Sequence, residues 1–209
     1  MPLTNTELRY YDSNVLRLPD DKRKEYHVQV DRLIAELSRS IRDKTEIKII
    51  PPNVTYTNKM VLHRGNREIE LLFLGRGHTA GDTVVFLPKE KIVCTGDLME
   101  SRIAFMGSAY FDEWLTTLDA LKRLDFTTDL PGHGAPFADK GLITEFQSYL
   151  RDVVAQAGKL RAQGVSADDA AKRVDLTKHA KAFPDILGPG AEVRGVRRIY
   201  AWLDEQKRK

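Results

Sequence analysis

The sequence has few of the residues that define several protein classes. Its 209 residues include one cysteine, Cys94, so a disulfide framework and a cysteine-rich zinc finger are both excluded. No stretch approaches the ~20 apolar residues of a membrane-spanning helix, and the N-terminal residues lack the apolar core of a signal peptide. We therefore expect no membrane association and a cytoplasmic location for the chain as written. That location becomes unknown if the true N-terminus lies upstream of Met1.

An excess of one charge is also lacking. The formal net charge is only +3, which is too small to indicate nucleic-acid binding, and we expect none. The basic residues gather late in the chain, from Arg194 to Lys209, where a solvated helix face explains them. Hydrophobic residues make up 42% and charged residues 30%, which is typical of a globular protein. The length suits one domain with a helical appendix.

Short apolar segments separated by turn residues occupy the middle of the chain. Their β-branched and aromatic content predicts sequential, mainly antiparallel strands, with a further strand at 127–130. The other periodic segments predict helices over 20–43, 111–124, from about 140 onward and over 192–205, with Ser166 as an N-cap. Residues 1–19 are ambiguous between a short strand and a turn. The predicted strands are Val54–Met60, Arg67–Leu74, Thr83–Leu87 and Lys91–Thr95.

Three glycine-flanked turns carry the residues that can do chemistry. They are GRGHTAGD at 75–82, TGD at 95–97 and PGHG at 131–134, and each follows a predicted strand. Loops on a rigid sheet are common places for functional residues, and imidazole and carboxylate groups are ligands that zinc takes. Any one of these turns can be purely structural. Together they predict that His78, Asp97 and His133 converge on a metal ion.

In this order the motifs resemble the second half of the metallo-β-lactamase superfamily, over the stretch from Val54 to about Tyr149. The resemblance implies an α/β fold, a partial αββα sandwich made mainly of its C-terminal half. We place the N-terminally truncated domain at 1–150 and a C-terminal helical extension at 151–209. The resemblance implies that His78 binds one metal, that Asp97 bridges two and that His133 binds the second. We expect Asp82 to hold its loop.

The activity that the resemblance implies is metal-dependent hydrolysis of a small molecule. In the complete family a metal-bound hydroxide attacks an ester, amide, thioester or phosphoester-type bond. The cofactor is Zn²⁺, as one or two ions, with iron or manganese as other options. Neither catalytic nor substrate-binding residues are assigned by the motifs. The segment 100–111 can line a substrate mouth with Arg102, Phe105, Met106 and Tyr110, although core packing explains its apolar members equally well.

The main family signature, His-x-His-x-Asp-His, does not occur in this sequence. The remaining histidines, His27, His63 and His179, are isolated, and we expect each at the surface. With three of seven family ligands, we expect either a homo-oligomer or a protein that needs a missing N-terminal half, because an incomplete sandwich exposes apolar surface. Whether this chain is an enzyme by itself is therefore open. The alternative is a truncated or degenerate, non-catalytic relative with weak or absent metal binding.

Two other kinds of site fit the sequence less well. Gly75-x-Gly77-x-x-Ala80 formally matches a dinucleotide-binding fingerprint, but that motif requires a following helix, whereas residues 82–87 read as a strand. A hydrolase with Cys94 as nucleophile lacks a histidine that the sequence places beside it. Cys94 lies in an apolar run, which indicates a buried structural thiol.

Overall fold

The computed structural model describes residues 28, 31–32, 34–35 and 50–207. By its internal contacts the chain divides into two units, Met1–Val54 and Thr55–Lys209. In the first unit, residues 28, 31–32 and 34–35 are helical and exposed. They fall within the helix predicted over 20–43. Most of that helix, and the segment 1–19 before it, lie outside the described residues.

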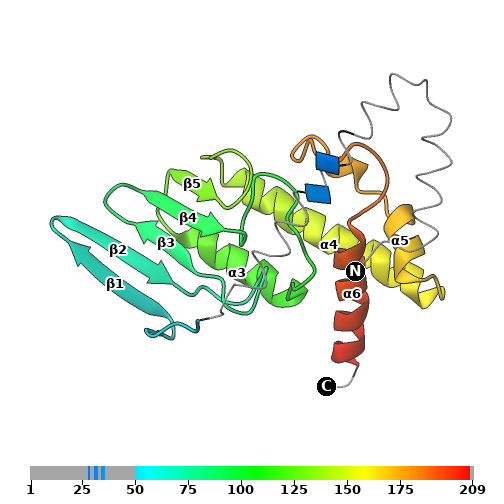
Figure 1. Cartoon of the computed structure of the whole chain (residues 1–209), viewed down its shortest axis with the longest axis horizontal. Coiled ribbons are helices and arrows are strands. Elements are labelled where there is room, and N and C mark those ends of the chain that lie inside the picture. The colour runs from blue at the N-terminus through cyan, green and yellow to red at the C-terminus, as the bar shows by residue number, and fades with distance from the viewer. Residues whose placement is uncertain (1–27, 29–30, 33, 36–49, 208–209) are drawn as a thin grey trace. The chain divides into compact units, whose positions relative to one another are not determined.

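The second unit contains a five-stranded sheet (Figure 1). Its strands follow one another across the sheet in chain order. Each neighbouring pair among β1 to β4 is antiparallel, whereas β5 is parallel to β4. Sheet and helices together confirm the predicted α/β class. The strands are β1 Lys59–Arg64, β2 Arg67–Leu72, β3 Val84–Leu87, β4 Ile92–Gly96 and β5 Thr128–Pro131.

The first strand starts and ends later than the sequence predicts. Arg64 pairs directly with Arg67, so the hairpin turn consists of Gly65 and Asn66 alone. Gly65 adopts a φ of +61°, the left-handed conformation that such two-residue turns require. Because the turn is this tight, pairing continues through His63, which lies in β1 and pairs with Glu68. It is exposed, as expected.

Helix α3, Phe111–Arg123, forms the crossover between β4 and β5. Parallel neighbours cannot be joined by a tight turn, so the chain needs such a connection. The helix buries Phe111, Trp114, Leu118 and Leu121, which share one face at three- and four-residue spacing. Acidic residues in its first turn and basic residues in its last suit the helix dipole. The helix predicted over 111–124 is confirmed.

Helices occupy the rest of the chain, as predicted. The side chain of Ser166 accepts a hydrogen bond from the backbone N–H of Asp169 at 3.1 Å, which confirms it as an N-cap. Helix α4 runs through residue 150, and the proposed boundary there stays a prediction. Among the described residues, no helix is long and apolar enough to cross a bilayer. The elements are α4 Gly141–Ala162, α5 Ala167–Arg173, the 3₁₀ turn η1 Thr177–His179 and α6 Val193–Gln206.

His179 is not at the surface, and this expectation was wrong. The η1 turn places it against α4, where it is 4% exposed. Its Nε2 lies 3.2 Å from Oδ2 of Asp152, and its ring meets that of Tyr149 edge-on at 5.6 Å. A histidine paired in this way is a packed, hydrogen-bonded part of the helical region.

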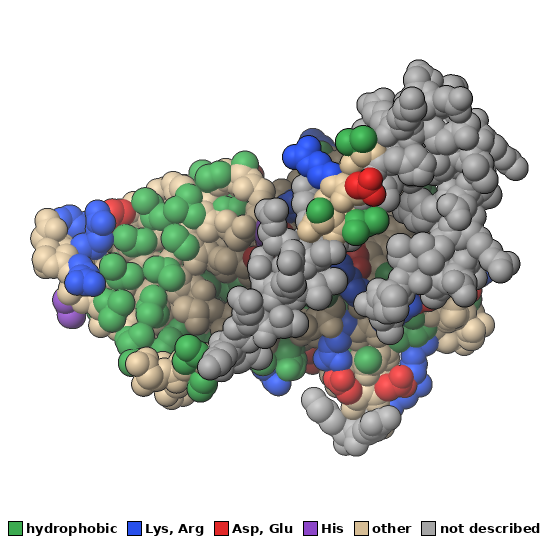
Figure 2. Space-filling model, in the orientation of Figure 1, with side chains coloured by type: hydrophobic (Ala, Val, Ile, Leu, Met, Phe, Trp, Pro, Cys, Tyr) green, Lys and Arg blue, Asp and Glu red, His purple; other side chains and the backbone are tan. Residues whose placement is uncertain are grey.

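The two faces of the sheet differ in what covers them. One face packs on the helices and buries Leu72, Val84, Phe86 and Val93. The other face is also apolar, although its side chains are only half-buried or exposed, and Figure 2 shows hydrophobic side chains gathered over it. By strand register this outer face comprises Met60, Leu62, Ile69, Leu71, Val85, Leu87, Ile92, Cys94 and Leu130.

Candidate metal centre

The turn between β2 and β3 is held by Asp82. Its carboxylate accepts hydrogen bonds from the backbone N–H of Thr79 at 3.0 Å and from the Thr79 hydroxyl at 2.6 Å, so it orders the loop as expected. A Cβ at Gly77 would lie 2.6 Å from a methyl carbon of Leu98 and 2.7 Å from the ring of Trp114. Glycine at this position therefore lets the turn pack directly on the core.

This turn presents His78 between two aromatic rings. The His78 ring meets Trp114 edge-on at 5.9 Å and Phe105 at 6.2 Å between centroids. Its Nε2 is buried and has no hydrogen-bond partner in the described part of the chain. Buried polar atoms are nearly always partnered. An orphaned imidazole nitrogen, oriented by packing on two sides, suits a metal ligand.

Asp97 and His133 come together where β4 and β5 end. These strands are parallel, so the residues that follow them emerge at the same edge of the sheet. The backbone N–H of Gly132 donates to the carbonyl of Gly96 at 2.9 Å, which joins the two turns. Nε2 of His133 lies 3.7 Å from Oδ1 of Asp97, and both side chains are partly open to solvent. The motifs TGD and PGHG thus meet as predicted.

Glu100 is a third member of this group, and the motifs did not predict it. One donor atom each from Asp97, Glu100 and His133 lies within 4.8 Å of the others. Glu100 is only 2% exposed. Burial raises its pKa to about 7, and the negative charge of Asp97 adds to the shift. The sequence signal was its position three residues after Asp97, which carries no information until the loop is seen to turn back.

His78 does not belong to the group of three within that distance. The structure therefore brings Asp97 and His133 together, adds Glu100, and leaves His78 in the adjoining turn with an unpartnered nitrogen. Two carboxylates and two imidazoles are a donor set that zinc, iron or manganese accepts. The residues fit a metal ion, and the assignment of His78, Asp97 and His133 as its ligands stays a prediction.

The loop from Glu100 to α3 is fastened by the C-terminal helix α6. The guanidinium of Arg194 lies 4.5 Å from the ring centre of Phe105, the same ring that contacts His78. Nε of Arg198 donates to the carbonyl of Ala109 at 2.9 Å. These contacts extend from α6 to the candidate centre, although α6 and the centre are far apart in sequence.

The residues considered for a substrate mouth take different positions. Met106 is fully buried, so its role is core packing. Tyr110 lies under the guanidinium of Arg76 at 4.4 Å. Phe105 remains 39% exposed, and Arg102 forms an exposed ion pair with Asp185 at 3.7 Å.

Comparison with known proteins relates part of this sequence to a family. No family profile matches the chain. A metallo-β-lactamase type 2 from Bacillus sp. (strain 170) is 37% identical over 95 residues, which are 43% of this chain and 35% of that protein. Part of this chain belongs to the metallo-β-lactamase superfamily. A solved metallo-β-lactamase from Pontibacter korlensis is 28% identical with a TM-score of 0.45, over 49% of this chain and 50% of that one.

The metallo-β-lactamase similarity covers only part of the chain. This chain spans about a third of the length of the curated metallo-β-lactamase from Bacillus. A separate match, 63% identical over 49 residues, is to a CBASS oligonucleotide cyclase CdnC from Escherichia coli (strain KTE188), and it covers 23% of this chain and 16% of that protein. The chain therefore resembles proteins of two differently named kinds, each over a part of its length.

Proposed function

We propose that this chain provides the metal centre of a metal-dependent hydrolase that acts on an ester, amide, thioester or phosphoester-type bond of a small molecule. The grouping of Asp97, Glu100 and His133 within 4.8 Å of one another carries the proposal. It lies on two of the three turns that bear the superfamily motifs. Metallo-β-lactamase relatives support the same chemistry.

Each residue has a distinct part in this proposal. Asp97, Glu100 and His133 would hold the ion, and His78 would offer a further donor from the adjoining turn. Phe105 and Trp114 keep the His78 ring in one orientation. When bound, such an ion polarises the scissile bond and supplies a nucleophile from water at neutral pH.

A second candidate function is that of a non-catalytic relative with weak or absent metal binding. The sequence lacks the His-x-His-x-Asp-His signature, and the His133 side chain is 59% exposed. An exposed ligand gains less from a bound ion because solvent competes for both partners. This candidate predicts a folded protein that retains no stoichiometric metal.

The two candidates are separated by metal content per chain. The protein is purified, equilibrated with Zn²⁺, passed over a desalting column and measured by elemental analysis together with protein concentration. The variants are His78→Ala, Asp97→Ala, Glu100→Gln and His133→Ala. His63→Ala is the matched control, because His63 is exposed on β1. Hydrolysis of nitrocefin, a p-nitrophenyl ester, an acyl thioester and a phosphodiester is then followed on the loaded protein.

We expect about one zinc ion per chain in the wild type and in His63→Ala, and a clear loss in the variants of the centre. Equal metal content in all proteins would remove the site assignment. Metal binding without hydrolysis of any of the four bond types would favour the non-catalytic relative.

A further inference from the structure

The turn that carries Asp97 and Glu100 is closed by one residue near the end of β4. The carbonyl of Thr95 accepts a hydrogen bond from the backbone N–H of Leu98 at 3.2 Å. The Thr95 hydroxyl lies 3.0 Å from the carbonyl of Met99, the residue directly before Glu100. Asp97 lies inside this turn and Glu100 directly follows it. Thr95 therefore holds the base of the segment that bears both carboxylates.

The loop that carries His133 is closed in a similar way by Asp129 on β5. Its backbone N–H donates to the carbonyl of Phe137 at 2.7 Å, and its carbonyl accepts from the N–H of Phe137 at 3.1 Å. These two hydrogen bonds form an isolated β-bridge between the two residues. Because His133 lies between the bridged residues, Asp129 fixes the base of its loop.

The side chains of Thr95 and Asp129 join these two loops inside the protein. The Thr95 hydroxyl lies 2.6 Å from Oδ1 of Asp129, and the two residues are 1% and 0% exposed. The loops also meet through the hydrogen bond from Gly132 to Gly96, but both of these glycines are exposed to solvent. The Thr95–Asp129 pair is thus a buried connection beneath an exposed one.

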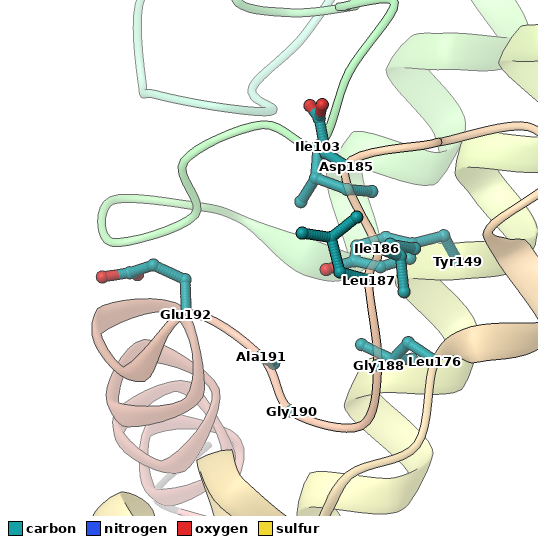
Figure 3. Close-up of a pocket in the computed structure, with 10 residues that line it drawn as sticks. All are labelled: Ile103, Tyr149, Leu176, Asp185, Ile186, Leu187, Gly188, Gly190, Ala191 and Glu192. Atoms are coloured by element: carbon teal, nitrogen blue, oxygen red, sulfur yellow. The ribbon is translucent and has the colours of Figure 1, made fainter.

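Directly beyond Glu100 the chain is held less closely. Ile103 borders a hollow of about 370 Å³, whose other walls come mainly from α4 and from the segment between η1 and α6 (Figure 3). Arg102 forms an exposed ion pair with Asp185 at 3.7 Å, and exposed ion pairs stabilise one conformation only slightly. The position of Glu100 therefore depends more on the turn that Thr95 closes than on the residues that directly follow it.

A fully buried carboxyl group on β5 destabilises the fold unless its contacts offset the loss of water. Oδ2 of Asp129 has no hydrogen-bond partner among the described residues, although buried polar atoms are nearly always partnered. Burial of a polar atom without a partner is unfavourable. An apolar side chain would fill the same space without this penalty. The contact that it could not make is the hydrogen bond to Thr95.

We propose that Thr95 and Asp129 are positioning residues of the candidate metal centre, and that their hydrogen bond holds together the two loops that bear its ligands. This inference rests on the proposed metal centre and adds the residues that keep its ligands in place. The pair acts through the loops and supplies no ligand itself. Loss of such supporting contacts typically weakens metal binding by about 10- to 100-fold.

The chain offers variants that isolate the hydroxyl group. Thr95→Val removes it and keeps the shape of the side chain, whereas Thr95→Ser keeps it. Thr127→Val is the matched control, because the Thr127 hydroxyl joins the starts of the same two strands through the carbonyl of Lys91 at 3.4 Å. The double variant Thr95→Val/Asp129→Leu replaces both partners by apolar groups, and it carries the test if Thr95→Val alone does not fold.

The first readout is amide hydrogen exchange in the metal-free protein, measured by NMR, so that it does not depend on metal binding. The N–H of Leu98 reports on the turn that bears the carboxylates. The N–H of Gly132 reports on the junction with the loop of His133. The N–H of Val174, which donates to the carbonyl of Ala170 at 3.0 Å, is the reference for opening elsewhere in the protein.

We expect Thr95→Val and the double variant to accelerate exchange at Leu98 and Gly132 about five- to tenfold more than at Val174, as for loss of one hydrogen bond. Thr95→Ser and Thr127→Val keep the wild-type pattern. Acceleration at Leu98 alone, or to the same extent at all three amides, would overturn the inference, because the Thr95 side chain would then not join the two loops.

The second readout is zinc affinity, measured by competition with a chromophoric chelator, together with the absorption spectrum of the Co²⁺-loaded protein as a record of ligand geometry. We expect Thr95→Val to bind zinc about tenfold more weakly and to change the Co²⁺ spectrum, whereas Thr95→Ser and Thr127→Val match the wild type. Equal zinc affinity in Thr95→Val and the wild type would overturn the positioning role. The expected exchange pattern in a protein that binds no zinc would contradict the proposed metal centre and support the link between the loops.

Discussion

Asp129 on β5 offers a direct test of the hydrogen-bond pattern beside the candidate centre. Its carboxyl is fully buried. The hydroxyl of Thr95 lies 2.6 Å from Oδ1 of Asp129 and 3.0 Å from the carbonyl of Met99. One hydroxyl carries one hydrogen. If Thr95 donates that hydrogen to Met99, Asp129 must itself be protonated and donate to Thr95.

The pKa of Asp129 agrees with this pattern. Burial raises it from 3.8 to about 7, against the opposing effect of the Thr95 hydrogen bond. Between these two values the folded protein binds more protons than the unfolded chain, so the free energy of unfolding falls as pH rises. A shift of about three units corresponds to at most about 4 kcal/mol. The free-energy cost of burying the ionised Asp129 carboxylate is fully present above pH 7. It is absent below 3.8, the ordinary pKa of this group.

The variant Asp129→Asn isolates this effect. Its neutral amide can donate to Thr95 as the protonated acid does, but it does not titrate. We expect the stability of the wild type relative to the variant to fall by about 2–3 kcal/mol between pH 5 and pH 8. Urea unfolding in the presence of a chelator measures this difference. Asp125→Asn is the control, because Asp125 forms an exposed ion pair with Lys91.

Parallel stability curves for the wild type and Asp129→Asn across this pH range would refute the reasoning. They would mean that Asp129 is ionised in the folded protein, with Thr95 as the donor to it.

Three further predictions concern other residues near the candidate centre and on the sheet. A Cβ at Gly132 would lie 2.1 Å from Oδ1 of Asp97, so Gly132→Ala displaces this carboxylate, and we expect at least tenfold weaker zinc binding by competition titration. Leu130 is 39% exposed on the apolar outer face of the sheet. We expect the wild type to self-associate through this face and Leu130→Lys to sediment as a monomer. A monomeric wild type would contradict this prediction. Arg194→Gln removes the cation–π contact with Phe105, and we expect zinc affinity about two- to fivefold lower, with an unchanged thermal midpoint as the check that the fold is intact.

Elements with strong periodicity were the ones that the sequence could predict. Helix α3 has an apolar residue on every turn of one face, and its amphipathic pattern fits only a helix packed on one side. Ser166 precedes a helix and has a backbone N–H three residues later to accept from. TGD and PGHG meet because the strands before them are parallel neighbours.

Features that depend on how the chain folds back could not be predicted. Glu100 joins the candidate centre only because its loop returns to the edge of the sheet. His179 is isolated in sequence, and its partner Asp152 lies on another helix. The start of β1 was misplaced because apolar residues continue on both sides of it, and only pairing with β2 selects the register.

The charge balance of the candidate centre is the strongest physical argument that it holds a cation. Donor atoms of Asp97 and Glu100 lie within 4.8 Å of each other, and Glu100 is buried. Two like charges so close, one of them removed from water, oppose each other's ionisation, and the raised pKa of Glu100 reflects this. A divalent ion would cancel both charges, and His133 supplies the third donor within the same 4.8 Å, one fewer than the four that tetrahedral zinc takes. The same count leaves no donors for a second ion among these residues. A single ion per chain is therefore the stoichiometry that this arrangement favours.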